Sequence, residues 1–468
     1  MTVRFVTLGC KLNFAESSAL GKSLMSSGFT RAEDGEAADV CVLNTCTVTD
    51  AADHKCRQAL SRLRRENPHA VIIATGCYAQ LAADGMSEKP AADGQQPEAG
   101  CRVAVATKGW EDADYILGND AKFSIPQLLE DLRRQKPDAG CRKSEARDQV
   151  VLSTPIREVE SFHGALSFSH VDSEDEEQHT TIADRSQRTR CFLKVQDGCN
   201  YFCTYCTIPY ARGKSRNPRI STLVAEAQQA IDEGAKEIVL TGVNIADFGR
   251  STGETFLALL QALDNLEGEY RLRIGSCEPN LLTEAIIDYV AASRHIAPHF
   301  HIPLQSGSNE VLRIMKRHYT RELFAERVAY IRQRLPYAFI GVDCMVGVRG
   351  ETAAYFDDYL SFVEQLEVSQ LHVFTYSERA RTRMVEMDLE IVPAVERKRR
   401  SDILHALSAQ KTRAFYAANE GREVCVLWES RNAKGQMAGF TENYLRVTAE
   451  YNPDKVNRFE NLVFTPNQ

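Results

Sequence analysis

The sequence predicts an α/β protein in three parts: an N-terminal parallel α/β domain, a partial (β/α)6 barrel and a small C-terminal β-barrel. Three observations predict this arrangement. Short apolar runs alternate with helical patterns at the start of the chain, the alternation becomes more regular after Cys191, and short strands separated by polar turns follow residue 420. Alternating strands and helices are typical of parallel sheets whose faces are covered by helices. The length of 468 residues agrees with two to four domains.

The N-terminal domain is expected over residues 1–133. Its buried strands are predicted at residues 3–8, 40–44 and 71–76, and its helices at residues 15–27 and 52–67. Residues 134–188 are expected to form a linker or insertion. Five of the six residues at 172–177 are acidic, and such a block is usually solvated.

The barrel is expected over residues 189–412. Its strands are predicted at 191–195, 237–241, 271–274, 299–303, 339–346 and 370–374, each followed by a helical pattern. Six strand–helix units are too few for a complete eight-unit barrel, so a partial barrel and an open doubly wound sheet both fit. In either case ligands are expected at the carboxyl ends of the strands.

The C-terminal domain is expected over residues 413–468, and a long helix is predicted at 394–419. Short strands are predicted at 423–428, 439–441, 445–449 and 461–464. About fifty residues of this kind suggest a small β-barrel that resembles an OB fold.

The composition places the chain among cytosolic globular proteins. No signal-peptide pattern opens it, no run of 18 apolar residues occurs, and the expected location is the cytoplasm, with no membrane. Its 14 Cys are therefore expected to be reduced and available as metal ligands or catalysts. The net charge of −8 excludes a uniformly basic nucleic-acid binder. Local basic runs remain, at residues 212–219, 313–321 and 397–400, and together with an OB-like module they favour RNA.

Three cysteines in one loop are the sharpest feature: Cys199, Cys203 and Cys206 have the spacing C-x3-C-x2-C after a predicted strand. Three thiolates can bind a 4Fe–4S cluster and leave one iron open to another ligand. A zinc site is the alternative, but it usually needs a fourth ligand nearby in sequence.

A second, dispersed set consists of Cys10, Cys46 and Cys77, each of which follows a predicted strand of the N-terminal sheet. Strand ends of one parallel sheet converge on one edge, so these thiols could form a second cluster site. Buried free cysteines are the competing interpretation, because Cys is among the most buried residue types. The same interpretation is preferred for five other cysteines within or beside predicted strands, namely Cys41, Cys191, Cys277, Cys344 and Cys425.

Polar residues gather at predicted strand ends of the barrel, where side chains commonly face the site. They are Asn244, Ser276, Glu278, His301 and Gln305.

The sequence resembles the radical S-adenosylmethionine (SAM) methylthiotransferase family, and within it the branch that modifies threonylcarbamoyladenosine in tRNA. The motifs Gly9-Cys-Lys-Leu-Asn13, Asn44-Thr-Cys46, Thr75-Gly-Cys-Tyr78 and Val195–Gly213 carry the resemblance, with Tyr205 before the last Cys of its loop. It covers nearly the whole chain except residues 85–109 and 137–189. It implies a flavodoxin-like N-terminal domain, a TIM-like barrel and a TRAM module.

The resemblance implies two 4Fe–4S clusters, one on Cys199, Cys203 and Cys206 and an auxiliary one on the N-terminal triad. SAM would chelate the open iron of the first cluster, and Tyr205, Asn244, Ser276, Glu278 and Gln305 would contribute to its binding. A radical derived from SAM would remove the hydrogen at C2 of the adenine, and a methylthio group would be inserted there. The implied partners are the anticodon loop of tRNA, an electron donor such as flavodoxin or ferredoxin, and a sulfur donor.

Other readings and some departures accompany this resemblance. The substrate could instead be isopentenyladenosine in tRNA or an aspartate of a ribosomal protein, and a non-catalytic, zinc-stabilised RNA-binding protein is the alternative from another class. The family usually has Gly-Phe-Pro-Gly-Glu-Thr where this chain has Gly347-Val-Arg-Gly-Glu-Thr352. Arg381 and Ala246 occupy positions where glycine is usual.

Overall fold

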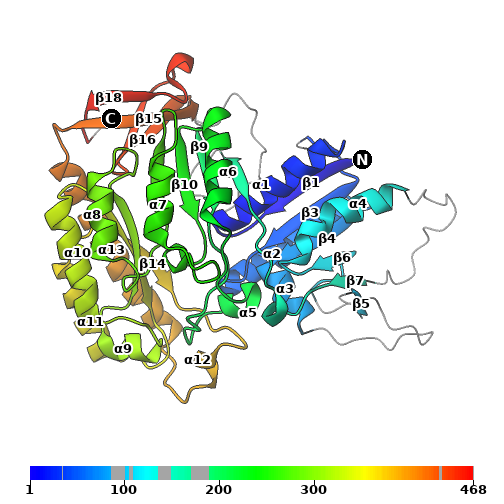
Figure 1. Ribbon diagram of the computed structural model, residues 1–468. Helices are drawn as coiled ribbons and strands as arrows, with labels where there is room; N and C mark the ends of the chain where they lie inside the picture. The colour runs from blue at the N-terminus through cyan, green and yellow to red at the C-terminus, as the bar shows by residue number, and fades with distance from the viewer. Residues whose placement is uncertain are drawn as a thin grey trace. The chain divides into compact units, whose positions relative to one another are not determined.

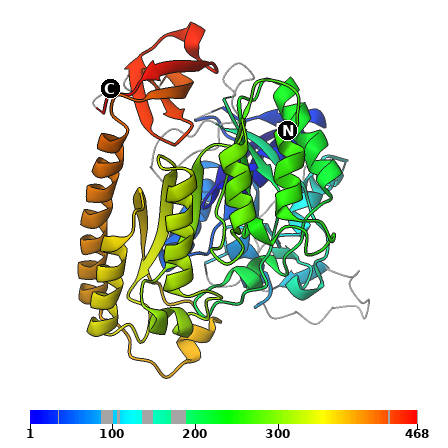
Figure 2. The same ribbon diagram turned by 60° about the vertical axis from the view of Figure 1, so that its left-hand side comes forward.

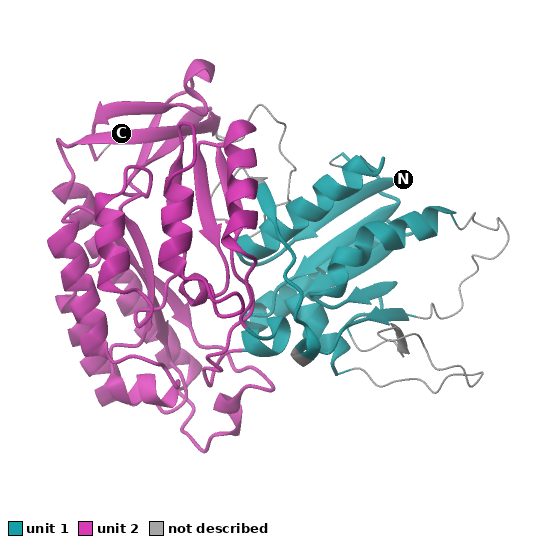
Figure 3. Cartoon of the chain, in the orientation of Figure 1, with its two compact units in different colours: residues 1–167, 173–182, 207–214 teal, residues 168–172, 183–206, 215–468 magenta. Residues whose placement is uncertain are grey.

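The computed structural model describes residues 1–33, 35–85, 101–104, 109–134, 149–169, 189–431 and 435–466. These residues form two compact units (Figure 3). The first contains residues 1–167 together with 207–214, and the second contains residues 168–169, 189–206 and 215 onward. The two units are described separately. None of the helices in the described residues is long and apolar enough to cross a membrane.

The first unit is built on a sheet with the strand order β2-β1-β3-β4-β6-β7-β5. Its strands are β1 (Thr2–Thr7), β2 (Thr30–Arg31), β3 (Val40–Thr45), β4 (Val71–Gly76), β5 (Cys101–Ala104), β6 (Tyr115–Leu117) and β7 (Gln149–Leu152). All neighbours pair in parallel except β5 and β7. The order of the first five strands is the flavodoxin-like one, which confirms the predicted fold class.

Helices cover both faces of this sheet, because successive strand residues point to opposite sides. The helices are α1 (Lys11–Ser26), α2 (Asp50–Glu66), α3 (Cys77–Ala83), α4 (Ile125–Arg134) and α5 (Ile208–Arg212). Leu43 of β3 packs with Leu60 of α2, while its neighbour Val42 packs with Leu24 of α1 and Leu129 of α4. All six residues of β3 are buried.

The second unit begins with a partial barrel built mainly of parallel strands (Figures 1 and 2). One sheet has the order β11-β10-β9-β8 and the other β12-β13-β14. The strands are β8 (Leu166–Ser169), β9 (Arg190–Lys194), β10 (Glu237–Thr241), β11 (Arg271–Ile274), β12 (His299–Gln305), β13 (Phe339–Val346) and β14 (Gln370–Thr375). Two isolated parallel bridges, one of them between Ser276 and His301, connect the sheets. The arrangement is therefore a partial barrel and not an open doubly wound sheet.

The helices of the barrel follow the predicted alternation. They are α6 (Ile220–Asp232), α7 (Phe256–Asp264), α8 (Glu284–Ala292), α9 (Asn309–Ile314), α10 (Arg321–Arg334), α11 (Ala353–Gln365) and α12 (Arg383–Glu386). Threonine side chains cap several of them: Thr352 Oγ1 accepts a hydrogen bond of 3.2 Å from the N–H of Tyr355 at the start of α11.

A long helix, α13 (Ala394–Ala418), leads to an antiparallel sheet of β15 (Glu423–Arg431), β16 (Gln436–Thr441), β17 (Arg446–Glu450) and β18 (Phe459–Val463) in the order β17-β16-β15-β18. Trp428, Val426, Leu445 and Phe464 form its core. The curled sheet agrees with the predicted small β-barrel (red and orange in Figure 2). It belongs to the same compact unit as the partial barrel.

The segment expected to be a linker differs from the prediction in its described part. Residues 149–152 form β7 of the first sheet, and residues 166–169 form β8 of the second. Both strands have only four residues, too short for periodicity to show them. The acidic block at 172–177 lies outside the described residues.

Two candidate cluster-binding sites

The first unit brings Cys10, Cys46 and Cys77 together. Cys10 precedes α1, Cys46 follows β3, and Cys77 begins α3 directly after β4. Because β1, β3 and β4 are parallel neighbours, these three strand ends share one edge. Burial raises the pKa of the Cys46 thiol, and the nearby Cys10 and Cys77 raise it further. The three sulfurs are therefore close enough to interact electrostatically.

The backbone around this triad leaves no room for additional side chains. A Cβ atom on Gly9, whose φ is +104°, would lie 2.6 Å from the Cβ of Cys46. A Cβ on Gly76 would lie 2.4 Å from the Oδ1 of Asn44. Asn13 Nδ2 donates to the carbonyls of Leu8 at 2.9 Å and Thr45 at 3.1 Å, which joins the first two loops.

A buried ionic network lies beside the triad, around Glu16 of α1. Arg212 Nη1 lies 3.1 Å from Glu16 Oε1, Arg212 Nη2 lies 2.7 Å from Asn13 Oδ1, and Lys122 forms a second ion pair with Glu16. Arg212 is only 1% exposed, and the more distant Arg216 is also buried. These two residues of the basic run at 212–219 are therefore not part of a surface for RNA phosphates, contrary to that sequence interpretation.

One further cysteine adjoins the triad, although no motif in the sequence points to it. Cys56 of α2 is buried; its Sγ lies 3.4 Å from both the backbone N and O of Cys46. Cys41, Cys191, Cys277 and Cys344 are buried as expected, whereas Cys425 is half-buried. Cys141 lies outside the described residues.

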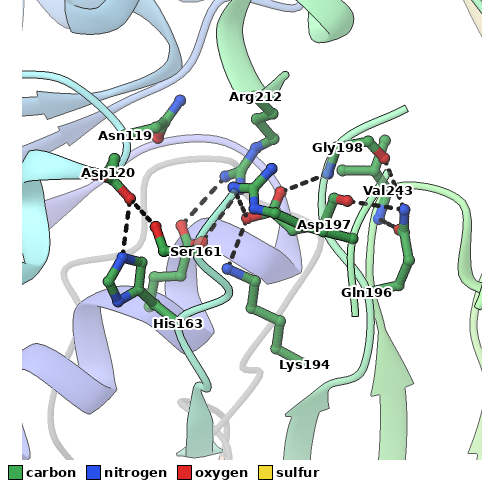
Figure 4. A network of polar contacts seen from close by, with 12 residues as sticks. Asn119, Asp120, Ser161, His163, Lys194, Gln196, Asp197, Gly198, Arg212 and Val243 are labelled. Carbon is green, nitrogen blue, oxygen red and sulfur yellow. Dashed lines mark hydrogen bonds and ion pairs between the residues drawn. The ribbon is translucent and has the colours of Figure 1, made fainter. Parts of the chain in front are cut away.

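In the second unit, the polypeptide between β9 and Cys199 is held rigidly. Gln196 Oε1 accepts hydrogen bonds from the N–H groups of Val243 at 3.0 Å and Asn244 at 2.8 Å, and its Nε2 donates to the carbonyl of Gly198 at 2.7 Å (Figure 4). Asp197 forms an ion pair of 2.8 Å with Lys194. These contacts fix the start of the Cys199–Cys206 loop against the carboxyl end of β10.

The loop itself presents its cysteines close to one another. Burial raises the pKa of Cys199 to about 12, and the neighbouring Cys203 contributes to that rise. The N–H of Cys206 donates to the carbonyl of Cys203 at 3.0 Å. The guanidinium of Arg317 donates from Nη1 to Cys203 Sγ at 3.1 Å, and Arg317 is itself paired with Glu278. The sequence analysis counted Arg317 in the basic run at 313–321 that favours RNA, and the 114 positions between Arg317 and Cys203 gave no sign of this contact.

The other residues predicted to bind SAM occupy the carboxyl ends of the barrel strands. Both polar atoms of the Asn244 amide and the Oε1 of Gln305 are buried without a hydrogen-bond partner. Gln305 has a left-handed backbone with φ of 65°. Tyr205 Oη lies 3.5 Å from Arg317, and Ser276 forms the bridge to His301. Buried polar groups without partners are costly, and a polar ligand would satisfy them.

The chemistry of these donors fits iron–sulfur clusters. Each unit presents three thiols, and thiolates are the usual ligands of such clusters. Within the described residues no group of three His, Cys, Asp or Glu side chains is gathered tightly enough to hold a single metal ion. A four-iron cluster takes one thiolate per iron and spaces its ligands more widely.

Two of the three departures from the family pattern, Arg349 and Arg381, have structural counterparts. Arg349 Nε lies 3.0 Å from Glu378 Oε2, and its Nη1 donates to the carbonyl of Val385 at 3.1 Å, so it ties two loops at the carboxyl ends of the strands. Arg381 has φ of 69°, the left-handed conformation that explains why glycine is usual there.

Comparisons with known proteins identify two family models that match parts of this chain. Residues 193–363 match the Radical SAM superfamily, and residues 2–94 match the uncharacterized protein family UPF0004. The chain is 33% identical over 463 residues to the threonylcarbamoyladenosine tRNA methylthiotransferase MtaB of Bacillus subtilis, covering 98% of this chain and 92% of that protein. It is 30% identical to a tRNA-2-methylthio-N(6)-dimethylallyladenosine synthase of Clostridium botulinum, covering 97% and 92%.

Among solved structures, the radical SAM methyltransferase TsrM of Kitasatospora setae has the same fold. The TM-score is 0.51 with 16% identity, over 80% of this chain and 72% of that one. Because the chain is 33% identical to the Bacillus subtilis methylthiotransferase over nearly its whole length, it belongs to the radical SAM methylthiotransferase family, and it is a transferase.

Proposed function

We propose that the protein inserts a methylthio group at C2 of N6-threonylcarbamoyladenosine beside the anticodon of tRNA. The observation that carries this proposal is the 33% identity to MtaB proteins from two bacteria over at least 96% of the chain. The alternative is dimethylallyladenosine, the substrate group in the names of relatives that are 30% identical or less. The higher identity favours the threonylcarbamoyl substrate.

Two 4Fe–4S clusters and SAM are the proposed cofactors. Cys199, Cys203 and Cys206 would hold the cluster that works with SAM, and Cys10, Cys46 and Cys77 would hold the auxiliary one. When bound, these groups supply the electron that cleaves SAM and the sulfur that is transferred. The chain holds the loops that carry the cysteines in place and keeps their thiols away from water. Cys46 and Cys203 are less than one-tenth exposed, which limits access of water and stray reductants.

SAM is expected to meet the unpartnered amide of Asn244 and the unpartnered Oε1 of Gln305 at the strand ends. The Arg317–Glu278 pair holds the guanidinium against Cys203 and thereby fixes that ligand. The expected partners besides tRNA are an electron donor, such as flavodoxin or ferredoxin, and a sulfur donor.

Nucleoside analysis tests the substrate. In a strain that lacks this gene, mass spectrometry of digested tRNA should show loss of 2-methylthio-threonylcarbamoyladenosine, while 2-methylthio-dimethylallyladenosine persists. The wild-type gene should restore the lost nucleoside. Loss of the dimethylallyl product instead would establish the alternative.

Cysteine variants test the two sites separately. Cys199→Ala should abolish SAM cleavage, whereas Cys10→Ala should leave cleavage intact and stop methylthio transfer. Cys41→Ala is a matched control, because this buried cysteine lies in β3 and belongs to neither triad. Methylthio transfer that survives Cys10→Ala would disprove the auxiliary site. Zinc without sulfide in anaerobically purified protein would support the non-catalytic RNA-binding alternative.

A further inference from the structure

Asn119, which follows β6 in the first unit, contacts a cysteine of the auxiliary site directly. Its Nδ2 lies 3.7 Å from Cys77 Sγ and 2.7 Å from the carbonyl oxygen of Ala211. The side chain is 5% exposed, and the backbone N–H donates to Gln80 Oε1 at 2.8 Å. Asn119 is therefore fixed at both its backbone and its side chain.

The surroundings determine which end of the Asn119 amide faces the sulfur. Lys122 Nζ lies 3.1 Å from Oδ1, and an ammonium group can only donate hydrogen bonds. The carbonyl of Ala211, on the other side, can only accept them. The oxygen must therefore face Lys122, and the NH2 group must face both Ala211 and Cys77. The buried ion pair of Lys122 with Glu16 holds the ammonium group in place. Figure 4 shows Asn119 in this part of the first unit.

We propose that Asn119 is a positioning residue that raises the reduction potential of the auxiliary cluster through an N–H···S hydrogen bond to Cys77. The inference rests on the proposed function, because it requires that the triad holds a cluster. Reduction adds negative charge, part of which spreads onto the thiolate sulfurs. A donor at a sulfur stabilises this charge, so it favours the reduced form; hydrogen bonds to cluster sulfurs are known to set such potentials.

The size of the effect follows from the strength of the hydrogen bond. A hydrogen bond to a charged acceptor is roughly twice as strong as one to a neutral acceptor, so the N–H···S bond strengthens when the sulfur gains negative charge. Losing the N–H group should therefore lower the ratio of reduced to oxidised cluster roughly tenfold at a fixed potential, which corresponds to about 59 mV for one electron.

The test uses the full chain with Cys199, Cys203 and Cys206 replaced by Ala, so that only the auxiliary site can bind a cluster. Asn119→Asp keeps an oxygen toward Lys122 but removes the N–H donor, and Asn119→Leu removes it without adding charge. After anaerobic reconstitution with iron and sulfide, a redox titration followed by electron paramagnetic resonance measures the midpoint potential. Both variants should titrate at a more negative potential than their parent, and the Asp variant should shift further.

Asn67→Asp is the matched control. Asn67 is another buried asparagine of the first unit, and its amide bonds the carbonyl of Leu63 and the N–H of Ala38 without touching a cysteine. Its substitution should leave the potential unchanged.

The outcomes separate this inference from the proposed function. A parent that binds no iron or sulfide would disprove the auxiliary cluster itself. A loaded Asn119→Leu variant with the parent's potential would overturn the role of Asn119. Loss of iron from both Asn119 variants, with circular dichroism unchanged, would also overturn it, because Asn119 would then serve assembly and not the potential.

Discussion

A buried carboxylate joins the partial barrel to the C-terminal β-domain, and Glu237→Gln tests this joint. Glu237 is fully buried at the start of β10, where its Oε2 accepts hydrogen bonds from Arg271 Nε at 2.6 Å and Arg273 Nη2 at 2.8 Å. Other N–H groups of these two arginines donate to four backbone carbonyls of the C-terminal domain at 3.1–3.3 Å, those of Cys425, Phe440, Thr441 and Glu442. One carboxylate thus orients two guanidinium groups toward the C-terminal domain.

The magnitude follows from burial. Removing one partner of a buried ion pair usually costs about 3–5 kcal/mol, because the other charge is left without compensation. Glutamine keeps the size of Glu237 and one hydrogen-bond acceptor, so the lower end applies. We expect the free energy of unfolding of this unit to fall by about 3 kcal/mol.

The chain provides a fluorescent reporter for this measurement. It has two tryptophans, and Trp428 is buried in the core of the C-terminal domain while Trp110 lies in the first unit. In a Trp110→Phe background, urea unfolding followed by the fluorescence of Trp428 reports on the joint. Glu269→Gln is the control: it removes a pair with Lys236 of 2.6 Å in which Glu269 is 68% exposed, and it should cost less than about 1 kcal/mol. Equal losses in both variants would refute the reasoning.

Three further predictions concern the loops and the barrel wall. Gly76→Ala should lower the melting temperature and the iron content of the auxiliary site, since the new Cβ meets backbone and side-chain atoms at 2.4–2.7 Å in a left-handed conformation. Arg349→Ala should cost about 1 kcal/mol in urea unfolding, because it removes the part-buried pair with Glu378. The acid side of the stability curve should flatten in Asp343→Asn. Burial alone would raise the pKa of Asp343, but the charge of His301 and its hydrogen bond of 2.7 Å lower it overall. The ionised Asp343 therefore stabilises the folded protein above pH ~4, and this stabilisation is lost below that pH.

Matched controls accompany these variants. Gly234 also has a positive φ, but the space around an added Cβ is open. Gly234→Ala should therefore lower the free energy of unfolding by only about 1 kcal/mol and leave the iron content unchanged. Arg313→Ala removes an arginine that is 76% exposed, with a weak 3.7 Å contact to Glu310, and should be nearly neutral. For Asp343, a melting temperature that falls equally in the wild type and in Asp343→Asn between pH 5 and pH 3 would contradict this link between ionisation and stability.

The long apolar runs made most of the architecture predictable. The strands β9 to β14 lie within two residues of their predicted ends, because each run is bounded by turns and followed by a helical pattern. The strands β5 to β7 were not predicted, since they have three or four residues and depend on pairing for their existence. The placement of Cys10, Cys46 and Cys77 after the ends of neighbouring parallel strands was predictable from the topology. The basic run at 212–219 was misread in part, because periodicity cannot show that Arg212 meets a carboxylate 196 positions away.

The contacts outside the two cysteine triads follow one scheme that sequence motifs cannot reveal. In the first unit, Glu16 holds Lys122, Lys122 orients the amide of Asn119, and the amide donates to Cys77. In the second unit, Glu278 holds Arg317, which donates directly to Cys203. A carboxylate thus fixes the donor at one sulfur of each site, but the donor is a neutral amide in one case and a cation in the other. A cation stabilises a thiolate more strongly than an amide does. The two sites therefore offer their ligands different electrostatic surroundings, although both present three cysteines.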